Sequence, residues 1–254
     1  MLKGNMDMHL QVELATAEND SLTLPIHYNN LLQGFIYSKV KDRMPQVHAQ
    51  GFVAGERTFR LFVFSRLIGR VKEVRDGHIV FYSPIKFKVG SPLKEFIEDL
   101  AEALLTVDEI HLGNVVFWPG ALALTPLPDF SNGRARGRAL SPVTVYSTLQ
   151  NPEGKKKTYY YHPAEKEFGQ QVKANLLKKA TALGIELSPE TPLELQPVNV
   201  RSNDLKVVYY KETVVKGWMG QYILSGDPRL LRLAFSAGIG SKNSQGFGML
   251  EPVV

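Results

Sequence analysis

Near the C-terminus, four glycines enclose a short polar segment whose composition suits the binding of phosphate. The segment reads Gly238-Ile-Gly-Ser-Lys-Asn-Ser-Gln-Gly-Phe-Gly248, two Gly-apolar-Gly pairs around five small or polar residues. Glycine permits positive φ and a close approach of the backbone to a ligand. Lys242 adds a positive charge, and successive exposed N–H groups in such a loop form a concavity for phosphate oxygens. We therefore expect a phosphate-binding loop.

Two common nucleotide-binding loops do not fit this segment. A Walker loop ends in Gly-Lys-Ser/Thr, whereas here Ser241 precedes Lys242 and Asn243 follows it. A dinucleotide fingerprint needs a third glycine where Asn243 stands, at the start of a βαβ unit. A solvated hairpin turn is the simpler alternative. The candidate contact residues of the loop are Gly238, Gly240, Ser241, Lys242, Asn243, Ser244, Gln245, Gly246 and Gly248.

Histidine is the residue type best suited to proton transfer near neutral pH. Of the six histidines, His48 lies in a loop after a predicted helix over residues 28–41, and Tyr37 lies on the polar face of that helix. Catalytic residues favour loops on a rigid scaffold. A solvated loop histidine and a tyrosine packed against a second domain are the alternatives. The chain has no cysteine and no His/Asp/Glu cluster with metal-ligand spacing, so we predict no metal site and no cofactor.

The pattern Gly-h-Gly-x5-Gly-h-Gly (h, apolar) close to the C-terminus resembles the glycine-rich signature of the RAMP superfamily of CRISPR-associated proteins. "GIGSKNSQGFGML" is most similar to the family that cuts CRISPR precursor transcripts, the sixth Cas family, in which this loop contacts RNA backbone. Further blocks follow the same order and extend the resemblance over most of the chain: "LLQGFIYSKV" with the His-bearing loop and "FRLFVFSRL", then "LSPVTVYS", then "EKEFGQQVKANLLKKA".

The resemblance implies a metal-independent endoribonuclease that cleaves CRISPR precursor RNA within its repeats to give crRNA. Attack by a ribose 2′-OH would leave a 2′,3′-cyclic phosphate and a 5′-hydroxyl. His48 corresponds to the family's general acid/base and Tyr37 to its catalytic tyrosine. The family's lysine soon after the histidine is missing, because no Lys lies between His48 and Lys72. Of the nearest cations, Arg57 and Arg60, we take Arg57 as the third catalytic candidate, in charge stabilisation rather than proton transfer.

The elements that must position these residues alternate in an order that predicts an α+β fold of tandem ferredoxin-like (βαββαβ) domains, as in RAMP and RRM proteins. We place the first domain at residues 1–124, a linker at 125–133 and the second domain at 134–254. The first domain comprises strand 8–14, helix 28–41, an apolar and therefore central strand 58–65, strand 78–89, helix 91–104 and strand 109–118. The second comprises strand 139–149, helix 168–183, strands 192–200 and 205–215, a short helix after Asp227 and strand 247–252.

The charge of the chain favours a polyanionic partner. Thirty Lys and Arg against twenty-five Asp and Glu give a formal net charge of +5, and such a surplus suits RNA where it is clustered. Arg134, Arg136 and Arg138 alternate and are predicted to contact phosphates, with a solubilising surface as the alternative. Lys155–Lys157 beside Tyr159–Tyr161 combine charge with stacking platforms, although a hairpin that buries alternate tyrosines is the favoured interpretation.

CRISPR repeat RNA and crRNA are the expected partners, and both a homodimer and other Cas proteins of an interference complex remain open. The absence of a signal region and of a membrane-spanning apolar run indicates a cytoplasmic location in a prokaryotic cell. The main alternative function is a non-catalytic RAMP subunit that binds crRNA in an interference complex, which the glycine-rich loop alone does not exclude. An unrelated ferredoxin-like RNA-binding module lacks the RNP1 signature and leaves the C-terminal motif unexplained.

Overall fold

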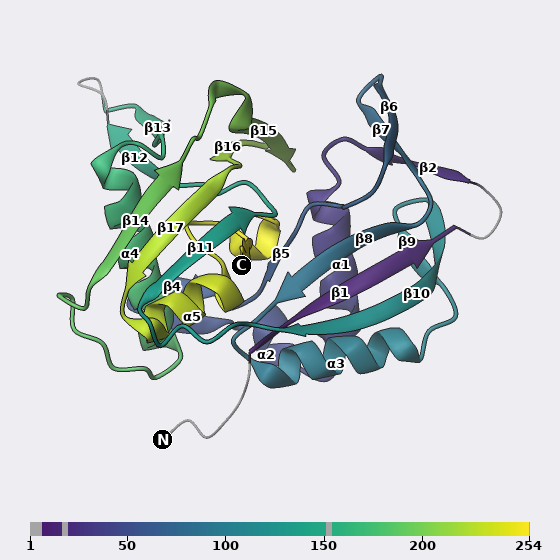
Figure 1. Cartoon of the computed structure of the whole chain (residues 1–254). Helices are drawn as coiled ribbons and strands as arrows, with labels where there is room; N and C mark the ends of the chain where they lie inside the picture. The colour runs from purple at the N-terminus through teal and green to yellow at the C-terminus, as the bar shows by residue number, and fades with distance from the viewer. Residues whose placement is uncertain (1–6, 17–19, 151–153, 254) are drawn as a thin grey trace.

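The computed structural model describes residues 7–16, 20–150 and 154–253. It consists of two α+β halves side by side, each with a sheet and helices against that sheet (Figure 1). Each half has its own hydrophobic core, the first formed by buried side chains between Leu10 and Phe117 and the second by side chains between Leu127 and Leu250. The helix carrying Tyr37 belongs to the first half and the glycine-rich loop to the second.

The N-terminal half is a ferredoxin-like unit with an antiparallel sheet in the order β5-β8-β1-β10-β9. Leu10, Val12 and Leu14 alternate along β1 and are fully buried, as expected for a strand with one covered face. The helices α1 and α3 pack on that face and on each other. The bounds are β1 (Met8–Ala15), α1 (Asn29–Val40), β5 (Val63–Phe64), β8 (Ile85–Gly90), α3 (Lys94–Leu105), β9 (Ile110–Leu112) and β10 (Val115–Pro126).

Two segments are inserted into this unit. One is a small sheet in the order β2-β7-β6, and the other carries a short helix, α2, followed by the hairpin β3–β4. The hairpin reaches the second half, where β3 contacts helix α4 (Lys166–Ala182). The bounds are β2 (Ser21–Pro25), α2 (Pro45–His48), β3 (Phe52–Ala54), β4 (Arg57–Phe59), β6 (Val71–Arg75) and β7 (His78–Tyr82).

The C-terminal half repeats the ferredoxin-like topology with the sheet order β14-β17-β11-β18. Its strands and helices are β11 (Arg134–Ala139), α4, β14 (Leu193–Val198), β17 (Gln221–Gly226), α5 (Pro228–Ala237) and β18 (Leu250–Pro252). The hairpins β12–β13 (Tyr146–Gln150, Lys156–Tyr160) and β15–β16 (Leu205–Tyr210, Thr213–Trp218) are additions to it, as are the 3-10 turns η1 (Ser202–Asp204) and η2 (Asn243–Gln245). The predicted tandem ferredoxin-like architecture is confirmed.

Several predicted strands differ from those in the structure. The expected central strand 58–65 is wrong, because the chain breaks at Leu61 (φ 50°) into β4 and the edge strand β5, which pairs with β8. The expected strand 78–89 is two strands, β7 and β8, in different sheets, and the expected strand 205–215 is the β15–β16 hairpin. The prediction also missed β17, which lies between β14 and β11 in the second sheet.

Candidate active site

Polar side chains on one face of helix α1, in the first half, bind the glycine-rich loop of the second half. Asn29, Gln33 and Tyr37 are spaced four residues apart and therefore lie on one side of the helix. The Asn29 side-chain amide donates hydrogen bonds to the carbonyl oxygens of Gln245 (2.9 Å) and Gly246 (3.2 Å). The Gln33 amide donates to the carbonyl of Ser244 (2.6 Å). These contacts join residues more than 200 positions apart in the sequence.

Tyr37 ends this stripe and presents its hydroxyl to polar groups from both halves. Its ring packs edge-on against Phe62, with ring centroids 5.3 Å apart. The hydroxyl is hydrogen-bonded with the side chains of Ser244 and Arg60. Burial raises the pKa of Tyr37, and the Arg60 charge and the two hydrogen bonds oppose that rise only in part. The phenol is therefore protonated at neutral pH and able to donate a hydrogen bond.

Arg60 lies between Tyr37 and the segment that follows His48. Gly51 has φ +68°, and a Cβ built on it would lie 2.5 Å from Nη1 of Arg60, so the guanidinium packs directly on this glycine. His48 was expected in a loop, but it is the last residue of the short helix α2, which the fully buried Val47 anchors in the first core. The side chain of His48 lies outside the described part of the structure. Its backbone is three residues from the glycine on which Arg60 packs.

The glycine-rich loop is shaped by internal contacts. Gly238, Gly240, Gly246 and Gly248 all have positive φ and are buried, and a Cβ on Gly246 would lie 2.6 Å from the Asn29 amide. The expected cradle of exposed N–H groups is wrong for four loop residues, whose N–H groups are not free to bind a phosphate. The N–H groups of Ser241, Gln245, Gly246 and Gly248 donate to carbonyl oxygens of the protein itself. The glycines therefore allow close packing, and the polar residues between them face the pocket.

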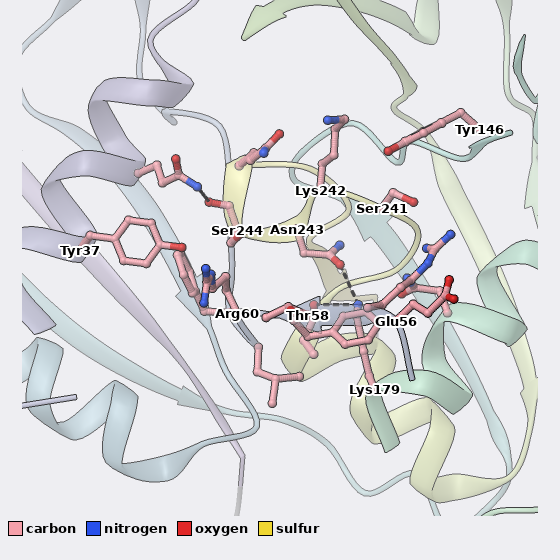
Figure 2. Close-up of a pocket in the computed structure, with 18 residues that line it drawn as sticks. Tyr37, Glu56, Thr58, Arg60, Tyr146, Lys179, Ser241, Lys242, Asn243 and Ser244 are labelled. Atoms are coloured by element: carbon pink, nitrogen blue, oxygen red, sulfur yellow. Dashed lines mark hydrogen bonds between the residues drawn. The ribbon is translucent and has the colours of Figure 1, made fainter. Parts of the chain in front are cut away.

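A buried lysine supports the loop from below. Lys179 of α4 is 2% exposed, and its ammonium group donates to the carbonyl of Gly238 (2.7 Å). It also donates to the carbonyl of Ala237 (3.2 Å) and to Oδ1 of Asn243 (2.7 Å) (Figure 2). The Asn243 amide in turn donates to the carbonyls of Ile239 and Phe247, both at 3.0 Å, and so closes the loop on itself. Burial lowers the pKa of Lys179 to about 7.

These groups line one pocket of about 500 Å³ between the two halves (Figure 2). Lys242 adopts a left-handed conformation (φ 62°) with Nζ 5.8 Å from the centre of the Tyr146 ring, and burial lowers its pKa. The charged residues of the lining are the cations Arg57, Arg60, Lys179 and Lys242 and a single carboxylate, Glu56. A pocket of this size with excess positive charge fits a polyanion better than an apolar ligand.

The structure distributes the predicted site residues over two places. Tyr37, Arg57 and the loop residues Ser241–Gln245 line the same pocket, and Arg57 is exposed there. The three predicted arginines lie instead on β11, a strand between β17 and β18, so the second domain begins with β11 and the expected first strand 139–149 is wrong. Their side chains are exposed, while the alternate positions pack toward α5; Arg136 donates to Gln221 (2.8 Å) and Arg138 to Glu251 (2.6 Å).

Sequence reasoning missed Asn29, Gln33 and Lys179 and ranked Arg57 ahead of Arg60. A signal for Lys179 exists, because Val172, Leu176 and Ala180 form the buried stripe of α4 and Lys179 falls on the same side. The Lys155–Lys157 and Tyr159–Tyr161 tract forms most of strand β13, with Tyr159 exposed and Tyr160 donating to the carbonyl of Val214. Within the described residues, no cluster of three or more His, Cys, Asp or Glu could hold a metal ion, and no helix could cross a membrane.

Comparison with known proteins shows which family this chain resembles. The family model for the C-terminal part of the CRISPR associated protein Cas6 matches residues 125–252, and the model for the N-terminal part of the CRISPR-associated protein Cas6 matches residues 23–119. CRISPR-associated endoribonuclease Cas6 1 of Methanocaldococcus jannaschii is 27% identical over 96% of this chain and 93% of its own length.

Solved structures agree with the family models. A structure of a CRISPR associated protein Cas6 superposes with a TM-score of 0.78 at 25% identity, over 98% of this chain and 100% of the other. A structure described as an RAMP protein binding different RNA substrates superposes with a TM-score of 0.80 over 97% of this chain and 100% of the other, and at 19% identity it supports the fold alone. The two family models together cover most of the sequence. The chain thus belongs to the Cas6 family of CRISPR-associated endoribonucleases.

Proposed function

We propose that this protein cleaves CRISPR repeat RNA in the pocket between its two halves, by attack of a ribose 2′-OH and without a metal ion. The proposal rests on one observation: Tyr37, Arg60 and the glycine-rich loop line the same cation-rich pocket. Arg60 also packs on Gly51, in the segment that begins at His48. The family relationship supports the same substrate class.

The reaction needs a base, an acid and a group that stabilises negative charge. A base takes the proton from the 2′-OH, the oxygen attacks the adjacent phosphorus, and an acid protonates the departing 5′-oxygen. This leaves a 2′,3′-cyclic phosphate and a 5′-hydroxyl. His48 suits one proton transfer because its ordinary pKa lies near neutrality. The protonated Tyr37 hydroxyl donates a hydrogen bond to a reacting oxygen or to a non-bridging phosphate oxygen.

Arg60 is better placed than Arg57 to stabilise the charge of the phosphorane. It is hydrogen-bonded with Tyr37 and packs on Gly51, whereas Arg57 lies exposed at the pocket wall. A guanidinium group can donate to two phosphate oxygens at once and remains charged throughout. We therefore assign charge stabilisation to Arg60 and substrate contact to Arg57. The side chains of Ser241, Lys242 and Ser244 would contact the neighbouring phosphates. The arginines of β11 would contact RNA farther from the cut.

The test is to incubate the purified protein with RNA that contains the CRISPR repeat of its own locus, and to map any cut. The proposal predicts one cut per repeat and none in a shuffled RNA of the same length and composition. Tight binding of the repeat without a cut would instead identify a non-catalytic crRNA-binding subunit. Cuts at many positions in both RNAs would indicate a nonspecific nuclease and contradict the proposal.

A further inference from the structure

Helix α4 carries two polar residues on its buried face. Val172, Leu176 and Ala180 are fully buried there, and Asn175 and Lys179 lie on the same side, 7% and 2% exposed. A buried polar group destabilises the fold unless it is hydrogen-bonded, so each of these side chains requires a partner. Lys179 has three acceptors in the loop and at the end of α5.

Asn175 differs from Lys179 because its buried Oδ1 accepts no hydrogen bond. Two other side-chain atoms in the described segments are likewise buried and unpartnered, Nη1 of Arg60 and Oε1 of Gln245. The three residues come from different elements, namely α4, the turn after β4 and the glycine-rich loop. All three nevertheless line the pocket between the two halves. The unpaired groups therefore all belong to residues of the pocket where a ligand is expected.

The kinds of atom left unpaired restrict the ligand. Two are acceptors, on Asn175 and Gln245, and one is a guanidinium donor, on Arg60. A fully deprotonated anion such as sulfate only accepts hydrogen bonds, so it would leave both acceptors unpaired. RNA supplies both kinds of group, since base amines, ring N–H groups and ribose hydroxyls donate while phosphates and base carbonyls accept.

We propose that Asn175 is a specificity-determining residue whose Oδ1 accepts a hydrogen bond from one donor of the RNA held in this pocket. The donor belongs to a base edge or to a 2′-hydroxyl of one nucleotide near the cut. This inference rests on the proposed function, because it assumes that repeat RNA occupies the pocket. A buried acceptor that finds no donor discriminates strongly against a substrate lacking that group, so Asn175 would read sequence or sugar at one position.

Asn175 is the best of the three residues for a test. Arg60 also contacts Tyr37, and Gln245 belongs to the loop held by Asn29. Leucine has nearly the shape of asparagine and no polar atom, so Asn175→Leu removes the acceptor without opening a cavity. Because an unpaired buried group is replaced by an apolar one, the variant should unfold at the same or a higher temperature than wild type. A gain in stability with a loss in RNA recognition is not expected of a merely structural residue.

The experiment combines protein and RNA changes. Wild type and Asn175→Leu are compared on repeat RNAs that each lack one donor near the cut: inosine for guanosine, purine riboside for adenosine, a pyrimidinone riboside for cytidine, or a single 2′-deoxynucleotide. The attacking 2′-OH is left in place. Both the dissociation constant and the single-turnover rate are measured. Gln171→Leu, which changes an exposed residue one turn earlier on α4, is the matched control and should behave as wild type.

The proposal predicts that one substitution weakens binding or slows cleavage by wild type about tenfold or more and has no further effect in Asn175→Leu. A base analogue in that role identifies a base edge, and a deoxynucleotide identifies a ribose. The proposal is overturned if every substitution affects the two proteins equally, or if Asn175→Leu handles unmodified RNA as wild type does. If Asn175→Leu does not fold, Asn175→Ala takes its place. Binding without cleavage by wild type would contradict the proposed function, and the dissociation constants would still decide the role of Asn175.

Discussion

At the scale of single residues, the site depends on groups whose positions are fixed by other side chains. Tyr37 is held by its edge-on contact with Phe62 and by hydrogen bonds with Ser244 and Arg60. Arg60 is held by Tyr37 and by close packing on Gly51. A donor that is already oriented stabilises the transition state more than one that must reorganise. The assignments of His48, Tyr37 and Arg60 therefore lead to separate predictions.

We predict that His48→Ala lowers the single-turnover rate of repeat cleavage by about 10²- to 10⁴-fold, the usual contribution of a general acid or base. The dissociation constant should change little, because the variant loses proton transfer and keeps the groups that bind RNA. His78→Ala, which changes an exposed histidine on β7, should cleave as wild type. An unchanged rate for His48→Ala would remove this residue from the mechanism.

The two arginines of the β3–β4 region provide a matched comparison. Arg60→Gln should slow cleavage by about 10²-fold, because it removes a charged donor beside Tyr37. Arg57→Gln should slow it by less than about tenfold and act mainly on binding, because Arg57 is exposed. Single-turnover rates and dissociation constants of both variants check this. The reverse order would return the third catalytic role to Arg57.

At the scale of elements, the glycine-rich loop is supported by α1 from one side and α4 from the other. Asn29 and Gln33 bind its carbonyls from α1, and Lys179 binds Asn243 and the end of α5 from α4. The helix α5 ends at Gly238, where two of the acceptors of Lys179 lie. A cation at a helix C-terminus interacts favourably with the helix dipole. The loop conformation should therefore depend on Lys179.

Lys179 should also make stability depend on pH. Its pKa in the folded protein is about 7, below its ordinary value of 10.5, so between these values the unfolded chain binds more protons. The free energy of unfolding should then rise with pH across this window, by up to about 1.4 kcal/mol per pH unit from this group, and show no such slope below pH 7. Chemical denaturation of wild type and Lys179→Met at several pH values measures the difference.

The free energy of unfolding of Lys179→Met should lack this rise with pH. Lys178→Met, which changes the exposed neighbour, should show the same rise as wild type. Identical slopes in wild type and Lys179→Met would show that the buried lysine does not titrate in this range. Lys179→Met should also bind RNA more weakly than Lys178→Met, because the loop loses its support from α4.

The elements were predictable where a local pattern specifies them. The helices expected over residues 28–41 and 168–183 correspond to α1 and α4, and the short helix expected after Asp227 corresponds to α5. The apolar run 58–65 misled the strand prediction, because periodicity does not reveal the break at Leu61. Within the site, Tyr37 and the loop carried a signal in residue type and spacing. The bonds from α1 to the loop did not, since no local pattern encodes a contact between Gln33 and Ser244.

At the scale of the whole molecule, the pocket exists only because the two halves are packed together. The hairpin β3–β4 of the first half contacts α4 of the second, and α1 contacts the glycine-rich loop. A further link joins the two sheets, where Glu251 of β18 pairs with Lys88 of β8 (2.5 Å) and with Arg138 of β11 (2.6 Å). The three arginines of β11, of which Arg138 belongs to this link, are exposed.

These arginines should contribute to RNA binding through charge alone. Removing one cation that neutralises a phosphate should reduce the slope of log K against log salt concentration by about 0.7 for single-stranded RNA. We predict this change for Arg134→Ala, with the cut position and the rate at saturating protein unchanged. Arg75→Ala, on the exposed strand β6, is the control and should leave the slope as in wild type. A changed cut position would assign Arg134 to substrate positioning instead.

The most direct test of the account is cleavage of repeat RNA in EDTA, with and without a single 2′-deoxy substitution at the nucleotide 5′ to the cut. Attack by that 2′-OH predicts a normal rate in EDTA for the unmodified RNA, and products with a 2′,3′-cyclic phosphate and a 5′-hydroxyl. It predicts no cut in the deoxy-substituted RNA, which should still bind with nearly the same affinity. Cleavage that requires a divalent metal ion, or a cut at the deoxynucleotide, would contradict the proposed chemistry of this pocket.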